Sequence, residues 1–468
     1  MGWKGSPSRI RSAHTGVIIK GGTMKNNSVA IYQLLKDSYE GSGGFVDGRY
    51  LTKHPREIDE KYLQRKELAY YLNYLKPCVD AHVSPIFKSL AAREYSGPGS
   101  AAWERFAKNV DFTGKILADL MKQSACAAKL YGVAFIVMDR GQASNIDTVQ
   151  KLENDRSALP YAFLVEPLRV EEVLLDKFGR IIKFVYAEPD EYEENKNAIR
   201  ELTIKGWKLK NSKGEREGSW DLGCVPVVPL YAKYHDPFNP FPASDFLSIA
   251  QTNLAIYNMS SWLSDIFVNQ TFSILVYPSN HMDDLTIGTS NALGFPPEAS
   301  HDPKFISPDA APATILSETI NRLQQECYRM ASVVNVTGVR AQSSGIAKAW
   351  DFEQTNQILS AFAGCIEAAE IRLADLFARF TGAELHYTVK YPNDFSIADV
   401  ETELANAEVA KGLNFGDEFN IEVFKRVLTS YLPELDDKDF DGLVEAYKQN
   451  VAQQKVDLQN QTTSGESE

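Results

Sequence analysis

Two stretches of helical periodicity on either side of a proline-rich insert place the strongest constraint on the fold of this 468-residue chain. The first stretch begins after Ser244, which can cap it, and fades near Gln270. The second begins near Ala313, and its apolar residues step by 4, 3, 4 and 3 positions, as in a heptad seam. Helices this long need partners along their sides, and packing inside one subunit is the commoner solution. The apolar positions are Phe246, Ile249, Ile256, Met259, Leu263 and Ile266 in the first stretch, and Leu316, Ile320, Leu323, Cys327 and Met330 in the second.

The insert and the segment after the second helix break the helical pattern. Residues 273–312 carry six prolines and are expected to form loops with one strand at 274–277. Small and polar residues from Asn335 to Gly345 end the second helix. A third long helix is predicted from about Ala347 to Phe380, with an apolar stripe at 3-4 spacing. Its stripe consists of Leu359, Phe362, Ile366, Ala369, Leu373 and Leu376.

The first 235 residues predict an α+β block with helices before strands. Residues 27–97 have a mostly helical pattern, which Pro77 and Pro85 interrupt or kink. A second helix at 112–130 leads into an apolar strand at 133–138. Two prolines make 223–229 an edge or an extended packing segment. Further strands are predicted at 161–165, 170–175, 180–187, 202–204 and 207–209.

The two ends of the chain differ from the rest in composition. Residues 1–25 hold five basic residues and no acidic ones. This pattern fits a disordered leader with Met24 as an alternative start, and a transit peptide is the other interpretation. After a strand at 384–390 the chain is predicted to be helical from 397 to 452. The polar tail, 453–468, is expected to be disordered.

Charge, hydropathy and cysteine spacing exclude several classes of protein. A net charge of −13 argues against tight, sequence-reading nucleic-acid binding, although not against a surface past which a polyanion slides. No apolar run approaches the length of a membrane span. The five cysteines are scattered without a CxxC pair, which predicts reduced thiols in a reducing compartment.

The search for catalytic motifs is negative. The sequence has no phosphate-binding GxxxxGK[ST] loop, no GxGxxG after a strand, no HExxH and no GxSxG elbow. His82 and His386 are expected to be structural. Ser343 and Ser344 have no His or Asp that can be nominated as a partner. Glu367 and Glu370 are interpreted as a solvated helix face.

One acidic segment resembles a calcium-binding loop. Asp437, Asp439, Asp441 and Gly442 match positions 1, 3, 5 and 6, but position 12 is Lys448 instead of a bidentate Glu. We favour helix capping by Asp439 or Asp441 over metal binding. The sequence therefore predicts no metal ion and no cofactor.

Several local patterns, taken in order along the chain, resemble a portal protein of tailed bacteriophages. The similarity covers most of residues 30–450 and lies in segment order, without one diagnostic motif. The segment 342–348, which opens a long helix after a helix–insert–helix unit, is the most specific piece. The other pieces are Arg65, 68–71 and Asn73, the helix-to-strand step 129–139, the hairpin 176–179 and the segment 222–228.

The resemblance implies a mostly helical α+β portal-like fold with a wing, stem, clip, tunnel helix and helical crown. Carried onto this chain, a wing spans 26–240 and follows the leader at 1–25. A first stem helix covers 241–271, a clip 272–312 and a second stem helix 313–334. A tunnel loop covers 335–348, a tunnel helix with a returning wing strand 349–396, and a crown 397–452, before the tail at 453–468.

The resemblance also implies a function. Portal proteins form closed rings, typically of twelve subunits, at one capsid vertex of the virion, and they are assembled in the host cytoplasm. The ring is the channel for packaging and ejection of double-stranded DNA, which passes without sequence recognition. Its expected partners are terminase, head–tail adaptor, capsid and scaffolding proteins, with no membrane. Tyr257 and Trp262 are expected to contact neighbouring subunits. The expected channel residues are Val336, Val339, Arg340, Gln342, Ser343, Ser344 and Lys348.

Two alternatives stay open. The first is another head–tail connector or virion structural protein without a channel. The second is a cytosolic enzyme, which would need a pocket where carboxylates such as Asp351, Glu353 or Glu367 converge with shifted pKa values. The sequence favours the portal and predicts no enzymatic activity.

Overall fold

A computed structural model gives the fold of two compact units, residues 1–395 and 396–468. The structure describes residues 20–23, 26–140, 159–270, 274–278, 292–295, 302, 304–306, 310–333, 345–393, 395, 407–410, 416–432, 439–450 and 453. Both leader and tail predictions, for 1–25 and 453–468, fall almost wholly outside these residues.

Five helices and one strand form the first part of unit one. The helices are α1 (Asn26–Glu40), α2 (Asp59–Leu68), α3 (Leu75–Val83), α4 (Ser100–Lys108) and α5 (Leu117–Tyr131). The prediction of a mostly helical 27–97 is wrong at its end, because β2 (Ala92–Ser96) is a strand. Pro77 does not interrupt α3, because it lies in the first turn, where the missing N–H has no intrahelical acceptor.

A single glycine allows α5 to pass directly into β3 (Val133–Arg140). Gly132 has φ 93°, and a Cβ at this position would lie 2.6 Å from the carbonyl oxygen of Pro242. No other residue fits this left-handed turn and close backbone approach.

The strands between residues 133 and 231, together with β1, pair antiparallel in two sheets. The largest sheet has the order β1-β5-β6-β7-β8-β9, with β1 (Lys20–Thr23), β5 (Val170–Leu175), β6 (Ile181–Pro189), β7 (Asn197–Thr203), β8 (Gly206–Asn211) and β9 (Gly214–Ser219). A second sheet has the order β10-β3-β4, with β4 (Pro160–Val165) and β10 (Val227–Tyr231). The predicted edge position of the proline-containing segment is confirmed, because β10 lies at one side of this sheet.

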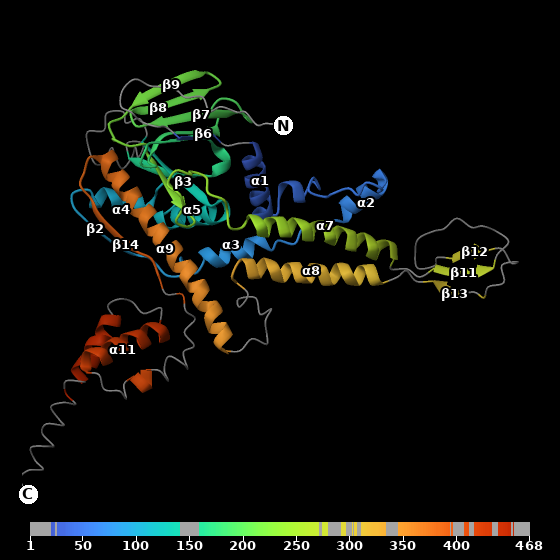
Figure 1. Cartoon of the computed structure of the whole chain (residues 1–468). Coiled ribbons are helices and arrows are strands. Elements are labelled where there is room, and N and C mark those ends of the chain that lie inside the picture. The colour runs from blue at the N-terminus through green and yellow to red at the C-terminus, as the bar shows by residue number, and fades with distance from the viewer. Residues whose placement is uncertain are drawn as a thin grey trace, which may run out of the picture. The chain divides into compact units, whose positions relative to one another are not determined.

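The strand β3 separates two hydrophobic cores. Residues 133–138 are completely buried, and alternate side chains point to opposite faces of a strand. Ala134, Ile136 and Met138 join the core formed with the helices, whereas Val133, Phe135 and Val137 join the core beneath the six-stranded sheet. The chain therefore has a helical layer and a sheet layer on either side of β3 (Figure 1).

The two long helices on either side of the insert are α7 (Leu247–Gln270) and α8 (Ala311–Met330). They pack side by side (Figure 1). The insert contributes a three-stranded sheet of order β12-β11-β13, made of β11 (Ile274–Pro278), β12 (Ala292–Phe295) and β13 (Lys304–Ile306). One strand was expected here, and the structure has three.

The third long helix, α9 (Gly345–Thr381), is followed by β14 (His386–Lys390). This strand pairs antiparallel with β2, so residues almost 300 positions apart form one two-stranded sheet. Unit two contains α11 (Asp417–Tyr431) and helical residues at 407–410 and 439–450, within the range predicted to be helical. The rings of Phe424 and Tyr447 stack there with centroids 4.2 Å apart. None of the described helices combines the length and hydrophobicity that a membrane crossing requires.

Candidate functional site

The inner half of α7, taken as residues 247–261 nearest the main body, is fixed by polar side chains that point inward. The Asn253 side chain is 1% exposed. Its Oδ1 accepts hydrogen bonds from the Tyr71 hydroxyl (2.8 Å) and the Tyr74 N–H (2.9 Å), and its Nδ2 donates to the Leu72 carbonyl (2.8 Å). One turn later, Asn258 Oδ1 accepts the Thr52 N–H at 2.7 Å. These bonds hold the segment between α1 and α3 against α7.

The aromatic residue Tyr257 belongs to this inner half as well. It was expected to contact a neighbouring subunit, and that expectation is wrong, because Tyr257 is 2% exposed. Its hydroxyl donates to the Phe45 carbonyl at 2.9 Å, and its ring packs edge-on against the Phe45 ring at 5.1 Å. The contacts of this tyrosine lie within its own chain.

A buried arginine ties α2 to α7. Arg65 is 1% exposed, and its guanidinium donates to Ser261 Oγ at 2.8 Å. It also donates to both carboxylate oxygens of Glu57 at 2.8 Å. These side-chain hydrogen bonds hold the pKa of Glu57 below its usual value. The N–H donors of the Arg65 guanidinium lie in one plane. Its two parallel hydrogen bonds to Glu57 therefore fix the orientation of the two side chains as well as their distance.

The outer half of α7, nearest the insert, exposes apolar side chains. Trp262 is 37%, Phe267 54% and Val268 50% exposed. Asp265 is the one charged residue in the 24-residue sequence of α7. At 100° per residue, Trp262 lies about 140° from Phe267 and about 120° from Val268 around the helix axis. The exposed apolar surface therefore faces more than one direction.

The heptad seam of α8 packs inside the subunit. Cys327 is fully buried and Ile320 is 9% exposed, whereas Met330 at the end of the seam is 37% exposed. The opposite side of α8 carries charges, among them Glu326 and Arg329, which form an ion pair at 2.7 Å. The two neighbouring helices thus differ in what they present to the outside.

The end of α8 is held to the body just before the predicted tunnel loop. Ala331 and Val333 are each 3% exposed. The carbonyl of Ala331 lies 2.6 Å from His82 Nε2, and the carbonyl of Ser332 accepts a hydrogen bond from the Thr355 hydroxyl at 2.7 Å. Burial lowers the pKa of His82 to about 4, so its ring is neutral at pH 7. The structural role expected of His82 agrees with these contacts.

The predicted channel residues follow this anchored end. Lys348 lies in the first turns of α9, and its side chain is not among the described ones. The other predicted residues lie outside the described residues, between α8 and α9: Val336, Val339, Arg340, Gln342, Ser343 and Ser344.

The apolar stripe of α9 is buried within the chain, and so is one carboxylate. Glu370 was interpreted as solvated, but it is completely buried. Its carboxylate pairs with Arg93 of β2 at 2.7 Å and accepts hydrogen bonds from the hydroxyls of Tyr387 and Tyr391. Strand β2, the returning strand β14 and the residue directly after β14 provide these groups, which the local pattern of α9 does not reveal.

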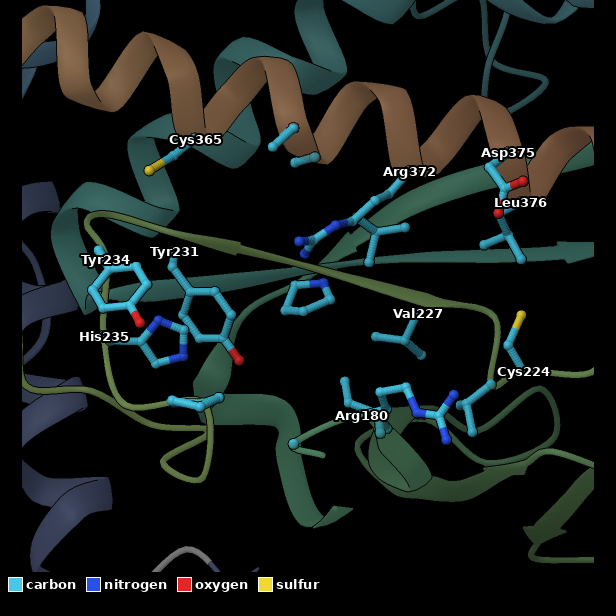
Figure 2. A pocket seen from close by; sticks show the side chains of 18 of the residues that line it. Arg180, Cys224, Val227, Tyr231, Tyr234, His235, Cys365, Arg372, Asp375 and Leu376 are labelled. Atoms are coloured by element: carbon cyan, nitrogen blue, oxygen red, sulfur yellow. The ribbon is translucent and has the colours of Figure 1, made fainter. Parts of the chain in front are cut away.

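A cavity of about 830 Å³ lies between α9, β10 and the β5–β6 hairpin. Figure 2 shows Arg372 extending from α9 into this space, across from Arg180 of the hairpin. Arg379 pairs with Asp375 at 3.0 Å at one end, and the rings of Tyr231 and His235 stack at the other, with centroids 3.5 Å apart. Guanidinium and aromatic groups together suit acidic side chains of a protein partner.

No group of three or more His, Cys, Asp or Glu side chains in the described part of the chain is placed to hold a metal ion. Asp437 lies outside the described residues, whereas Asp439 and Asp441 lie in the first turn of the helical residues 439–450. Lys448, in the place of the bidentate glutamate, pairs with Glu445 at 3.3 Å.

Comparison with known proteins gives matches among solved structures. No protein-family model matches the chain. No curated protein matches it. A structure described as the virion of a native gene transfer agent particle contains a chain 12% identical, with a TM-score of 0.42, covering 84% of this chain and 98% of that one.

Two further matches come from the necks of gene transfer agent particles. The chain from the empty particle, computed with C6 symmetry, is 12% identical with a TM-score of 0.44, covering 87% of this chain and 94% of that one. The chain from the native particle, computed with C12 symmetry, is 13% identical with a TM-score of 0.41, covering 81% and 98%.

Proposed function

We propose that this chain is a subunit of a dodecameric portal ring, in which neighbouring subunits cover the outer half of α7. The observation that carries the proposal is the exposure of Trp262, Phe267 and Val268 on a helix with a single charged residue. Exposed apolar clusters on soluble proteins mark interaction sites. Because these side chains face more than one direction, they suit a neighbour on each side.

Contacts of this kind generate a ring. A subunit that uses two different surfaces, one for each neighbour, forms a head-to-tail interface, and such interfaces close into rings when the rotation between subunits allows it. The paired helices α7 and α8 would line the ring as its stem. The remaining parts would be the wing at 26–240, the clip at 272–312, the tunnel helix with its returning strand at 349–396 and the crown at 397–452.

The segment between α8 and α9 is proposed to meet DNA in the central channel. The residues just before it are fixed to the body, because the Ala331 carbonyl bonds His82 and the Ser332 carbonyl bonds Thr355. Arg340 and Lys348 would touch phosphates transiently. A net charge of −13 on each subunit disfavours strong retention of a polyanion, which suits a channel through which DNA slides.

The proposed role is structural, without catalysis. The ring would sit at one capsid vertex of the virion, with terminase and then head–tail adaptor proteins docking on it, and with capsid and scaffolding proteins around it. The basic and aromatic cavity between α9 and β10 is a candidate surface for an acidic segment of one of these proteins.

Negative-stain imaging of the purified protein, together with its mass in solution, tests the proposal. Rings with a central hole wide enough for duplex DNA are expected. A compact small oligomer without a hole would contradict the portal and favour a connector without a channel.

Replacing Arg340 with Glu tests the channel contact separately. Packaging of DNA is expected to fall while ring formation stays normal, because the substituted side chain repels phosphate. Unchanged packaging in normal rings would remove Arg340 from the channel.

A further inference from the structure

The ammonium group of Lys129, in the last turn of α5, is buried without a counter-ion. Lys129 is 5% exposed, and its Nζ lies over the ring of Phe362, 4.5 Å from the centroid. The other buried charged side chains in the described part of the chain all make hydrogen bonds: Asp37, Arg65, Asp139, Asp176 and Glu370. Burial lowers the pKa of Lys129 to about 8, so most of the population carries the charge at pH 7.

This lysine lines a cavity of about 510 Å³ where α3, α5, the start of α7, the end of α8 and α9 meet. Most of the lining is apolar, including Phe246, Ile249, Ile358 and Phe362. A second polar group on the wall, His82 Nδ1, is buried and has no hydrogen-bond partner. The volume falls within the range of sites that hold small organic ligands.

Asp245 is the acidic residue of the lining, and its charge raises the pKa of Lys129, but its ion pair is with another lysine. Asp245 forms an ion pair with Lys233, and the side chains of both are more than half exposed. The lining thus carries two ammonium groups against one carboxylate, and the carboxylate is already paired. One negative charge is needed to balance the site.

We infer that this cavity binds an organic carboxylate with an apolar body. A single buried ammonium matches a single carboxylate, because a charged group taken out of water needs a counter-charge. Inorganic phosphate fits less well, because it requires several donors around it. The apolar walls would hold the body of the ligand, which can be a free organic acid or an acidic side chain from a protein segment.

Binding of sodium hexanoate to the purified full-length chain, followed by titration calorimetry, tests this site. One hexanoate per chain is expected to bind, whereas 1-hexanol and inorganic phosphate are expected to bind at least tenfold more weakly. Lys129→Met should weaken hexanoate binding at least tenfold. Lys122→Met, on the exposed side of the same helix, is the matched control and should leave it unchanged.

A second variant separates loss of the site from loss of the fold. Ala361→Trp fills the cavity from α9 and leaves Lys129 in place, so it should also abolish binding. Absence of hexanoate binding to the wild-type chain, or equal binding by wild type and Lys129→Met, would overturn the inference.

The oligomeric state distinguishes the two sources of carboxylate. If an acidic side chain of a neighbouring copy fills the site, hexanoate will bind the monomer and not the assembled ring. If the natural ligand is a free acid, both forms will bind it. The site itself does not depend on the proposed function, since its residues all lie in one chain.

Discussion

The inner and outer halves of α7 have a similar, nearly uncharged sequence, but the side chains of the inner half are buried and several of the outer half are exposed. Inner residues such as Asn253, Tyr257 and Ser261 are at most 2% exposed and make hydrogen bonds to residues 45–74. Outer residues such as Trp262 and Phe267 are 37% and 54% exposed. The comparison shows that one helix can complete its packing within the chain at one end and leave it incomplete at the other. Assembly and folding should therefore respond to different substitutions.

The largest effect is expected when the outer half is charged. Trp262→Glu combined with Phe267→Glu would place two carboxylates in the proposed subunit interface, where desolvation of unpaired charges costs several kcal/mol. A loss of about 4 kcal/mol corresponds to roughly a thousandfold weaker association. Sedimentation velocity should show monomers whose circular dichroism spectrum matches that of the wild type.

The matched control for this prediction is Gln251→Glu, which adds one carboxylate to an exposed position of the inner half. It should leave both assembly and stability unchanged. Rings of normal size from the doubly charged variant would show that the outer half of α7 is not an interface.

The second effect concerns folding and is expected at Arg65. Arg65→Met removes the charge that pairs with the Glu57 carboxylate and one of the hydrogen bonds of the Ser261 hydroxyl. Loss of one member of a buried ion pair lowers the free energy of unfolding by about 3–5 kcal/mol. Denaturant unfolding of the monomer measures it, and Gln64→Met, exposed on the same helix, is the control. A change below 1 kcal/mol would mean that α2 is not held to α7 by this group.

The third effect is a pH dependence at the inner end of the helix pair. His82 packs its ring edge-on against Phe246, 5.4 Å between centroids, and has a pKa of about 4 instead of 6.5. The unfolded chain therefore binds a proton more readily than the folded one between these values. Stability is fully present above pH 6.5 and falls by about 3 kcal/mol as the pH drops to about 4.

Comparison with His82→Gln isolates this contribution from that of the carboxylates. Between pH 6.5 and 4, the variant should lose less stability than the wild type. His386→Gln, on an exposed strand position, should follow the wild-type curve. Parallel curves for wild type and His82→Gln would contradict a neutral buried imidazole.

Sequence reasoning predicted the elements better than their contacts. Helical spacing located α7, α8 and α9 to within a few residues, and the two prolines of 223–229 correctly placed β10 at a sheet edge. These features depend on local periodicity and on the missing N–H of proline. β2 was missed because its five residues, AREYS, lack a clear alternation and are stabilised by pairing with β14.

The buried polar groups could not be predicted because their partners are distant in sequence. Glu370 looks solvated on a helical wheel, but its partner Arg93 is 277 positions away. Lys129 likewise gives no local signal, since its cavity is formed by five helices that are far apart in the sequence. Asn253 and Asn258 did offer a clue. Amides that recur on the apolar side of a nearly uncharged helix indicate buried hydrogen bonds.

The smallest effect is expected at the first residues of α7, where Ser244 was predicted to be a cap. Its Oγ accepts the Phe246 N–H at 3.0 Å and donates to the Leu130 carbonyl at 2.7 Å. Ser244→Ala removes both bonds and should lower the free energy of unfolding by about 1 kcal/mol, the usual value for a lost cap. The inner half should stay folded, because Asn253, Tyr257 and Asn258 hold it independently.

Ser248→Ala, exposed in the first turn, should change stability by less than about 0.5 kcal/mol, because alanine has the higher helix propensity. Equal effects from the two serines would mean that Ser244 contributes only its intrinsic propensity, and that the start of α7 is fixed by packing alone.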